Sequence, residues 1–322
     1  SLASTAPTGR RLASRLPRVP EPLFRRLALA NVVAVVALVG TGAWVRLSES
    51  GLGCPTWPEC YGGRLAANGS YHSLVEFVNR CVITAVAVLI GAAVLAAIWS
   101  VRRRRDLVWL SFGLFAGYVS EAVLGGLTVL AKLTPALVAA HLVVAMLLLA
   151  DAVVLHWRAG RPPGPAGPAA GRDARRLARL LLVTLAAVVI LGTVVAGAGP
   201  YAGSRDVPRF AFHFQSAAEL HAVVVMFLVG ATVATYFALR ADAAAPVAQR
   251  AYHVLLAVTV AQGAIGYAQY FSGLPVLLVE AHILGAAVLV VAAVRFNLAV
   301  GTDRAAAPRP AVDAPLATDR SR

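Results

Sequence analysis

Long apolar stretches dominate the pattern of hydrophobic and polar positions along the chain. Each has about 20 mostly apolar residues, the length that an α-helix needs to cross the hydrocarbon core of a bilayer. They occupy residues 27–46, 75–99, 107–130, 136–157, 180–199, 216–238, 252–271 and 276–296. Strands of a membrane barrel would show short alternating segments instead. The pattern therefore predicts an all-α integral membrane protein with eight transmembrane helices.

Three polar segments, rich in Arg, Pro and Gly, bracket and divide this pattern. Such segments lack the apolar residues of a packed core and are typical of disordered ends and linkers. We expect a disordered basic N-terminus over residues 1–26, a Pro/Gly/Arg linker over 158–179 and a disordered tail over 298–322. The helices then form an N-terminal half, residues 27–157, and a C-terminal half, residues 180–297.

Composition and charge agree with a membrane protein. The chain is 59% hydrophobic, whereas soluble domains are roughly 45–50% apolar. The net charge of +14 does not indicate a nucleic-acid partner, because its distribution follows the membrane topology. With a cytoplasmic N-terminus, 23 of the 29 Lys and Arg lie in cytoplasmic segments, including the run at 102–105. This positive-inside bias predicts a multi-pass cell-membrane protein with both termini cytoplasmic.

The loop after the first helix, VRLSESGLGCPTWPEC, holds two of the three cysteines. The predicted topology puts Cys54 and Cys60 on the extracytoplasmic side, where disulfides form and persist. Their close spacing, with Pro55 and Pro58 between them, favours a disulfide across a tight loop. Two free thiols are the alternative. Cys81 lies within the second helix, and we expect it to be a packing residue.

The two halves repeat one another. Residues 121–141, EAVLGGLTVLAKLTPALVAAH, and residues 262–282, QGAIGYAQYFSGLPVLLVEAH, share a Gly at the fifth position and a final Ala-His. The first and fifth helices share a Gly-Thr pair at 40–41 and 192–193. Because four spans are an even number, both halves have the same orientation. We therefore expect two tandem pseudo-symmetric four-helix bundles, related by an axis along the membrane normal.

Three histidines lie at one depth in these bundles. His141 and His282 are near the starts of the fourth and eighth helices, and His221 is near the start of the sixth. The matching place on the second helix holds Asn79. Ionisable residues inside a membrane are costly and indicate function by default.

Two imidazoles from facing helices, His221 and His282, suit a haem iron with two axial ligands. Zinc is less favoured because no third and fourth ligand occurs at that depth. The alternative is a set of interior histidines with only structural partners.

Acidic residues gather at the same depth: Glu76, Glu121, Glu219 and Glu280. Glu76 lies three residues before Asn79 on one helix face. A buried carboxylate beside a metal can transfer protons. The alternative is a structural pair with Arg80 or Arg46, and Glu219 and Glu280 can instead face water at the helix ends.

Three outer arginines, Arg46, Arg205 and Arg209, lie where haem propionates would emerge. A guanidinium binds a carboxylate in a bidentate manner. Interfacial arginines with no ligand are the alternative.

Taken together, these motifs resemble the haem A synthase family. That family shows VRLTGSGL-x-CP-x-WP-x-C after the first helix, where this chain has VRLSESGLGCPTWPEC. It shows Glu-x-x-His-Arg on the second helix, where this chain has EFVNR, and GGLTVL followed by a His in the fourth. It has TGAGPHAG after the fifth helix, here VAGAGPYAG, and a His after QYF-x-G-x-P in the eighth. The resemblance covers about residues 27–297.

The resemblance implies an oxidoreductase that converts the C8 methyl of haem O to a formyl group, with water as oxygen source. The product, haem A, serves cytochrome oxidase. A fixed haem b would be bound by His221 and His282, with the substrate haem near His141 in the other half. Glu76 matches the family's functionally important glutamate, and the cysteine pair would cover the substrate side. Haem O synthase, oxidase assembly factors and an electron acceptor that the sequence does not identify are the implied partners.

Asn79 departs from the family, since many members have a second substrate-haem ligand there. Either His141 alone holds the substrate iron, or another group such as His72 moves in, or a water bridges Asn79 to the iron. Two other functions stay open: a membrane b-type cytochrome that only passes electrons, and a haem carrier. No loop shows a flavin or nicotinamide fingerprint.

Overall fold

The computed structural model describes residues 18–100, 104–162, 167, 169–241 and 244–301. Within these ranges it has eight helices: α2 (Glu21–Leu47), α3 (Tyr71–Ile98), α4 (Arg105–Leu130), α5 (Pro135–Ala159), α6 (Arg172–Ala198), α7 (Phe214–Ala241), α8 (Pro246–Phe271) and α9 (Val276–Gly301). Each is long and apolar enough to cross a membrane. The predicted all-α fold with eight spans is confirmed.

Most helices begin before their apolar segments, with the largest extensions in α6, α2 and α8. α2 begins at Glu21 because Pro22 falls in its first turn, where a proline costs no hydrogen bond, and Glu21 suits the positive end of the helix. α6 begins at Arg172, inside the expected linker. Much of the expected disorder falls in residues 1–17 and 302–322, and part of the arginine run is at 101–103. All three stretches lie outside the described residues.

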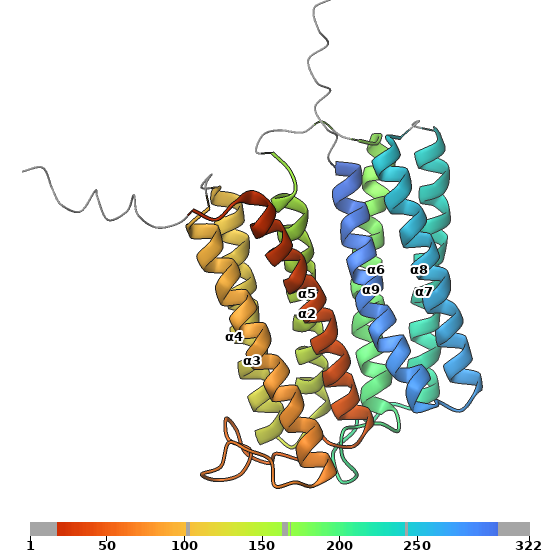
Figure 1. Ribbon diagram of the computed structural model, residues 1–322. Helices are drawn as coiled ribbons and strands as arrows, with labels where there is room; N and C mark the ends of the chain where they lie inside the picture. The colour runs from red at the N-terminus through yellow and green to blue at the C-terminus, as the bar shows by residue number, and fades with distance from the viewer. Residues whose placement is uncertain (1–17, 101–103, 163–166, 168, 242–243, 302–322) are drawn as a thin grey trace, which may run out of the picture.

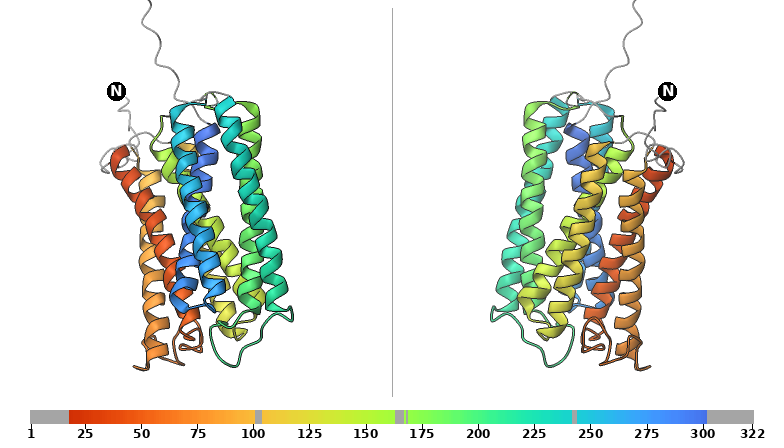
Figure 2. Two further views of the ribbon diagram at one scale, coloured as in Figure 1. Left: turned by 90° about the vertical axis from the view of Figure 1, so that its right-hand side faces the viewer. Right: turned by 90° about the vertical axis from the view of Figure 1, so that its left-hand side faces the viewer.

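The helices form two four-helix bundles side by side, α2–α5 and α6–α9 (Figures 1 and 2). In each bundle the first helix packs against the fourth, α2 on α5 and α6 on α9. The bundles meet through α2 with α9, α5 with α6, and α5 with α9. If the two halves are exchanged, the contact of α2 with α9 becomes that of α6 with α5, and the contact of α5 with α9 maps onto itself. This is the contact pattern of a pseudo-twofold axis, which agrees with the repeat.

Small residues fill the helix contacts, and large apolar side chains cover the outside. Ala28, Ala93, Ala152 and Ala287 are fully buried, as is typical of helix packing in membranes, where small residues let backbones approach. Exposed apolar side chains on the helices include Val88, Trp109, Phe227, Phe237 and Val260. An apolar outer surface is what a lipid environment requires.

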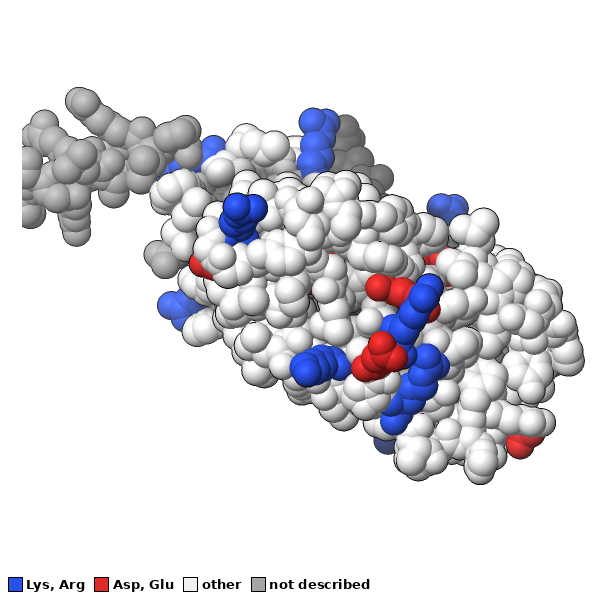
Figure 3. Space-filling view, turned by 90° about the horizontal axis from the view of Figure 1, so that it is seen from below, with Lys and Arg blue, Asp and Glu red and all other residues white. Residues whose placement is uncertain are grey.

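Two long loops lie at the same end of the molecule, one after α2 and one after α6 (Figure 1). Viewed from that end, the surface is mostly uncharged, with a few acidic and basic side chains (Figure 3). The histidine-bearing ends of α5, α7 and α9 lie just beneath these loops, because each of those helices begins at this end. The fold therefore brings the loops and the histidines together.

Candidate functional site

Each of the three deep histidines packs against a glycine on the preceding helix. A Cβ atom at Gly125 would lie 3.4 Å from Cε1 of His141, and one at Gly192 would lie 3.4 Å from Cε1 of His221. The third pair is tighter, with 3.1 Å between a Cβ at Gly266 and Cε1 of His282. The glycines thus leave room for the Cε1 edge of each ring against the neighbouring helix. The repeat was visible in sequence, and its physical reason is this contact.

His221 and His282 come from diagonally placed helices of the C-terminal bundle. Among the described residues α7 and α9 do not pack against each other, but each of them packs against both α6 and α8. The two imidazoles are nonetheless near enough to interact electrostatically. Nδ1 of His221 is buried without a hydrogen-bond partner. Nδ1 of His282 lies 3.1 Å from Nε2 of Gln262 on α8. Two imidazoles on helices that do not pack against each other fit a haem iron between them.

The N-terminal bundle has one histidine at this depth. Nδ1 of His141 lies 3.1 Å from Oε2 of Glu121 on α4, and it has no hydrogen-bond partner among the described residues. The His141 side chain keeps 38% of its surface exposed inside the bundle. On the diagonal helix α3, Asn79 accepts a hydrogen bond of 2.7 Å from the hydroxyl of Thr41. His141 is therefore the single deep histidine of this bundle, whereas Asn79 is hydrogen-bonded to α2.

Glu76 is buried at 5% exposure and held by two donors. The backbone N–H of Cys54 donates to Oε2 at 2.8 Å, and Arg80 donates to Oε1 at 2.7 Å. The pairing with Arg80 is the structural alternative considered from the sequence, and it is present. It also joins Glu76 to the disulfide loop, which the sequence did not reveal.

Arg80 fixes the disulfide loop to α3. It donates to four loop carbonyls, those of Cys54, Thr56, Pro58 and Glu59. The predicted Cys54–Cys60 disulfide is present, with 4.2 Å between the Cα atoms. The loop also contains a cis peptide bond between Trp57 and Pro58. The loop is therefore a folded cover on the N-terminal bundle, and its attachment point is the residue next to Asn79.

Trp57 closes this cover against α4. A Cβ at Gly126 would lie 2.7 Å from the Trp57 ring, so only glycine fits there without movement. The two adjacent glycines of GGLTVL thus serve different contacts: Gly125 receives His141 and Gly126 receives Trp57. Sequence analysis missed Trp57 as a contact of the site, although the motif itself was the signal.

The three outer arginines have partners within the protein. Arg46 donates to the carbonyls of Tyr201 at 2.8 Å and Ala196 at 2.7 Å. Arg209 donates to the carbonyl of Gly199. Arg205, whose side chain is 86% exposed, pairs with Glu49 at 3.1 Å. Arg46 and Arg205 therefore link the end of α2 to the loop after α6, across the two halves.

The structure corrects or refines the expectations for four further residues. Cys81 is exposed on α3 and so is not a core packing residue. Glu219 is exposed, as the water-facing alternative predicted. Glu280 is different, because its Oε2 is buried without a partner and a Cβ at Gly40 would lie 3.5 Å from its Oε1. It sits where α9 packs on α2 of the other half. His72 contacts the loop, with Nδ1 3.0 Å from the hydroxyl of Ser50.

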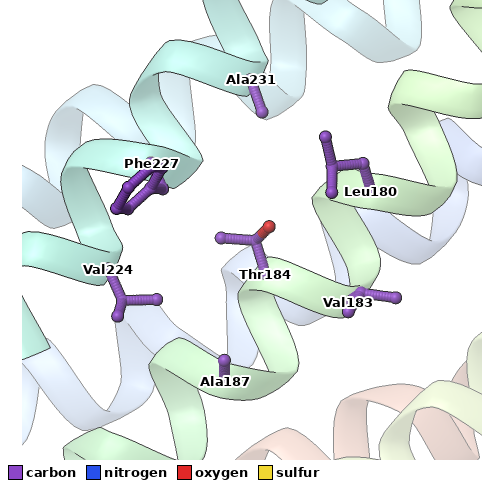
Figure 4. A pocket seen from close by; sticks show the side chains of 7 residues that line it. All are labelled: Leu180, Val183, Thr184, Ala187, Val224, Phe227 and Ala231. Carbon is purple, nitrogen blue, oxygen red and sulfur yellow. The ribbon is translucent and has the colours of Figure 1, made fainter.

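A shallow apolar groove lies between α6 and α7 (Figure 4). Its lining includes Leu180, Val183, Val224 and Phe227, with Thr184 as the one hydroxyl. None of the deep histidines or acids lines it, so this groove is separate from the chemistry. Within the described residues, no group of three or more His, Cys, Asp or Glu could hold a bare metal ion.

A membrane protein with eight helices in two bundles, each presenting histidine to its interior, is by class a candidate membrane haem protein. The chain belongs to the cytochrome oxidase assembly protein family, COX15-CtaA, which matches residues 25–294. Similar proteins support this. One named heme A synthase from Symbiobacterium thermophilum is 37% identical over 122 residues, which cover 37% of this chain and 39% of that protein. Another of the same name, from Alkalihalophilus pseudofirmus, is 28% identical over 141 residues, 41% of this chain and 46% of that protein. Each match spans less than half of the relative's length.

Proposed function

We propose that this chain is a haem A synthase, which oxidises the C8 methyl of haem O to a formyl group for cytochrome oxidase. One observation carries the proposal beyond family membership: the two halves present unequal sites. The C-terminal half has two deep histidines, His221 and His282, each set against a glycine of an adjacent helix, as a fixed cofactor needs. The N-terminal half has one available histidine, His141, beside a covered carboxylate, Glu76. An exchangeable substrate needs such an asymmetric site.

The reaction removes four electrons and four protons from one methyl group and one water molecule. In this proposal His141 binds the substrate iron, and Glu76, fixed by Cys54 and Arg80, takes up protons near the methyl group. The disulfide loop excludes bulk water over the site. A haem b held by His221 and His282 would supply a route for single electrons to an external acceptor. Asn79 keeps the second axial side of the substrate free of a protein ligand.

The outer arginines are proposed to face propionates. Arg205 is the most available, because its one described partner is Glu49 at an exposed position. Arg46 and Arg209 already donate to backbone carbonyls, so their proposed role is to shape the loop around the propionates. The distribution of Lys and Arg supports a topology in which the loops lie on the extracytoplasmic side and both termini are cytoplasmic. The proposed partners are a haem O synthase and oxidase assembly factors.

Haem extraction from cells that make this chain together with a haem O synthase tests the proposal. Chromatography should show haem A or its alcohol intermediate, and cells lacking the chain should show only haem B and haem O. Haem B and unconverted haem O, with folded protein in the membrane, would contradict the proposal. That result would favour an electron-passing cytochrome or a haem carrier.

A further inference from the structure

Glu121 and Gln262 occupy the same place in the two halves. Each lies 20 residues before its histidine, Glu121 before His141 and Gln262 before His282, at the first position of the repeated stretch. Each is 9% exposed, on α4 or α8, the helix that pairs with the histidine's own helix. Each places a side-chain polar atom 3.1 Å from Nδ1 of its histidine. The repeat therefore preserves a partner for the ring, while the chemistry of that partner changes.

These partners fix which edge of each ring is available. In both halves the Nδ1 edge faces the polar side chain, and Cε1 lies against Gly125 or Gly266. Nε2 is then the nitrogen left to bind an iron. Partners at the other ring nitrogen orient metal-binding histidines and raise the basicity of the ligand. His221 has no such side chain, and a backbone carbonyl, that of Val188, lies toward its ring.

The two partners differ in strength. A carboxylate is a stronger hydrogen-bond acceptor than a carboxamide. Gln262 also donates to the backbone carbonyl of His282 at 2.8 Å, and its Oε1 is buried without a partner. Because an amide carries both a donor and an acceptor, a half turn would present Oε1 to a protonated Nδ1, and it would give up the hydrogen bond that Nε2 donates to the carbonyl of His282. Glu121 Oε1 is likewise buried without a partner.

We infer that Glu121 and Gln262 are positioning residues for His141 and His282, and that the carboxyl-for-amide difference makes His141 the more electron-donating ligand. The inference rests on the proposed function, since it assigns both histidines to haem iron. For the reaction, the inference means that the two haem irons have histidine ligands of different donor strength. The substrate iron receives the stronger donor, and the fixed haem b receives the weaker one, which favours its reduced form.

The reduction midpoint potential of the b-type haem in the purified full chain tests the C-terminal member. Gln262→Glu should lower the potential, and Gln262→Met, which removes the acceptor at similar volume, should raise it. Thr259→Val is the matched control: it lies on the same helix, and its hydroxyl bonds only the backbone of Leu255. That control should leave the potential unchanged. A merely structural role for Gln262 would alter haem retention or thermal stability but not shift the potential in opposite directions.

Resonance Raman spectroscopy tests the N-terminal member. With haem O supplied by a co-expressed haem O synthase, Glu121→Gln should lower the iron–histidine stretching frequency of the reduced haem in the N-terminal half. Unmoved potentials in both Gln262 variants and an unmoved frequency in Glu121→Gln would overturn the inference and leave the proposed function standing. Loss of haem from both Gln262 variants with the fold preserved would also overturn the inference. His282 is still present in those variants, so Gln262 would then be needed for haem binding itself and not only to position the ligand. A parent protein without any low-spin haem would overturn the proposed function as well.

Discussion

The two halves of the molecule share one framework and differ in the polar residues placed on it. Both bundles set a histidine against a glycine, and both give that histidine a polar partner on the neighbouring helix. The C-terminal bundle adds a second histidine, His221, where the N-terminal bundle has Asn79 hydrogen-bonded to Thr41. The framework is thus shared, and under the proposed function these few side chains would decide whether the bound haem is fixed or exchangeable.

The loops show the same contrast. After α2, the loop folds back on its own half through Arg80, Trp57 and the disulfide. After α6, the loop reaches across instead, where the carbonyl of Tyr201 accepts from Arg46 and that of Gly203 accepts from the N–H of Gly51. The N-terminal half therefore carries its own cover, and the other loop holds the two halves together. This is the arrangement expected if chemistry occurs under the first loop.

The largest expected effect comes from removing the paired histidines. His221→Ala or His282→Ala should abolish the low-spin b-type spectrum of the purified protein, because each would leave the iron with one axial ligand. The reduced-minus-oxidised absorption spectrum measures this directly. His213→Ala, at an exposed position just before α7, is the control and should keep the full spectrum. An unchanged spectrum in either ligand variant would remove the proposed difference between the halves.

A second large effect is expected in the other half. Glu76→Gln should retain the b-type haem but reduce conversion of haem O by on the order of 100-fold or more, as expected when a proton-transferring group is lost. Haem chromatography gives the conversion, and absorption spectroscopy gives the haem content. Glu219→Gln, an exposed acid on α7, is the matched control. Normal haem A production by Glu76→Gln would leave this carboxylate with only its structural pairing to Arg80.

A smaller effect is expected from a substitution that gives the N-terminal half a second deep histidine. Asn79→His should add a low-spin signal from the N-terminal site when haem is present, because a second imidazole would then face His141 across the bundle. Val78→His, one position away on an exposed face of α3, is the control and should add none. Electron paramagnetic resonance separates the new signal from that of the C-terminal haem. No new signal would mean that position 79 does not face the iron.

The fold could be predicted from the sequence because each helix carries its own signal. Apolar run length gave the eight spans, and the repeat gave the pairing of the halves. The starts of α2, α6 and α8 were missed because polar and proline-containing first turns have no apolar signature, although Pro22 and Pro246 are well placed there. Cys81 was expected to be buried, but a membrane helix exposes apolar side chains on one face, so hydrophobic surroundings in sequence do not determine burial.

The site was less predictable because its contacts join distant segments. The histidine depth followed from helix order, and the disulfide followed from topology and spacing. The hold of Arg80 on the loop and the contact of Trp57 with Gly126 depend on how the loop folds, which no local pattern encodes. Gln262 and Glu121 begin the two repeated stretches, but the sequence does not show what they contact. In the structure each lies 3.1 Å from Nδ1 of the histidine in its own half.

The smallest expected effect concerns the cover itself. Cys54→Ser or Cys60→Ser should destabilise the loop by about 2 kcal/mol, the chain-entropy value for so short a closed loop. Arg80 and Trp57 would still hold the loop, so helix packing and the b-type haem should remain. Limited proteolysis of the loop measures the effect, with Cys81→Ser, an exposed free thiol, as control. Because the Cys54 N–H holds Glu76, a looser loop should also slow conversion of haem O. Faster proteolysis with unchanged conversion would show that the disulfide stabilises the cover without positioning the carboxylate beneath it.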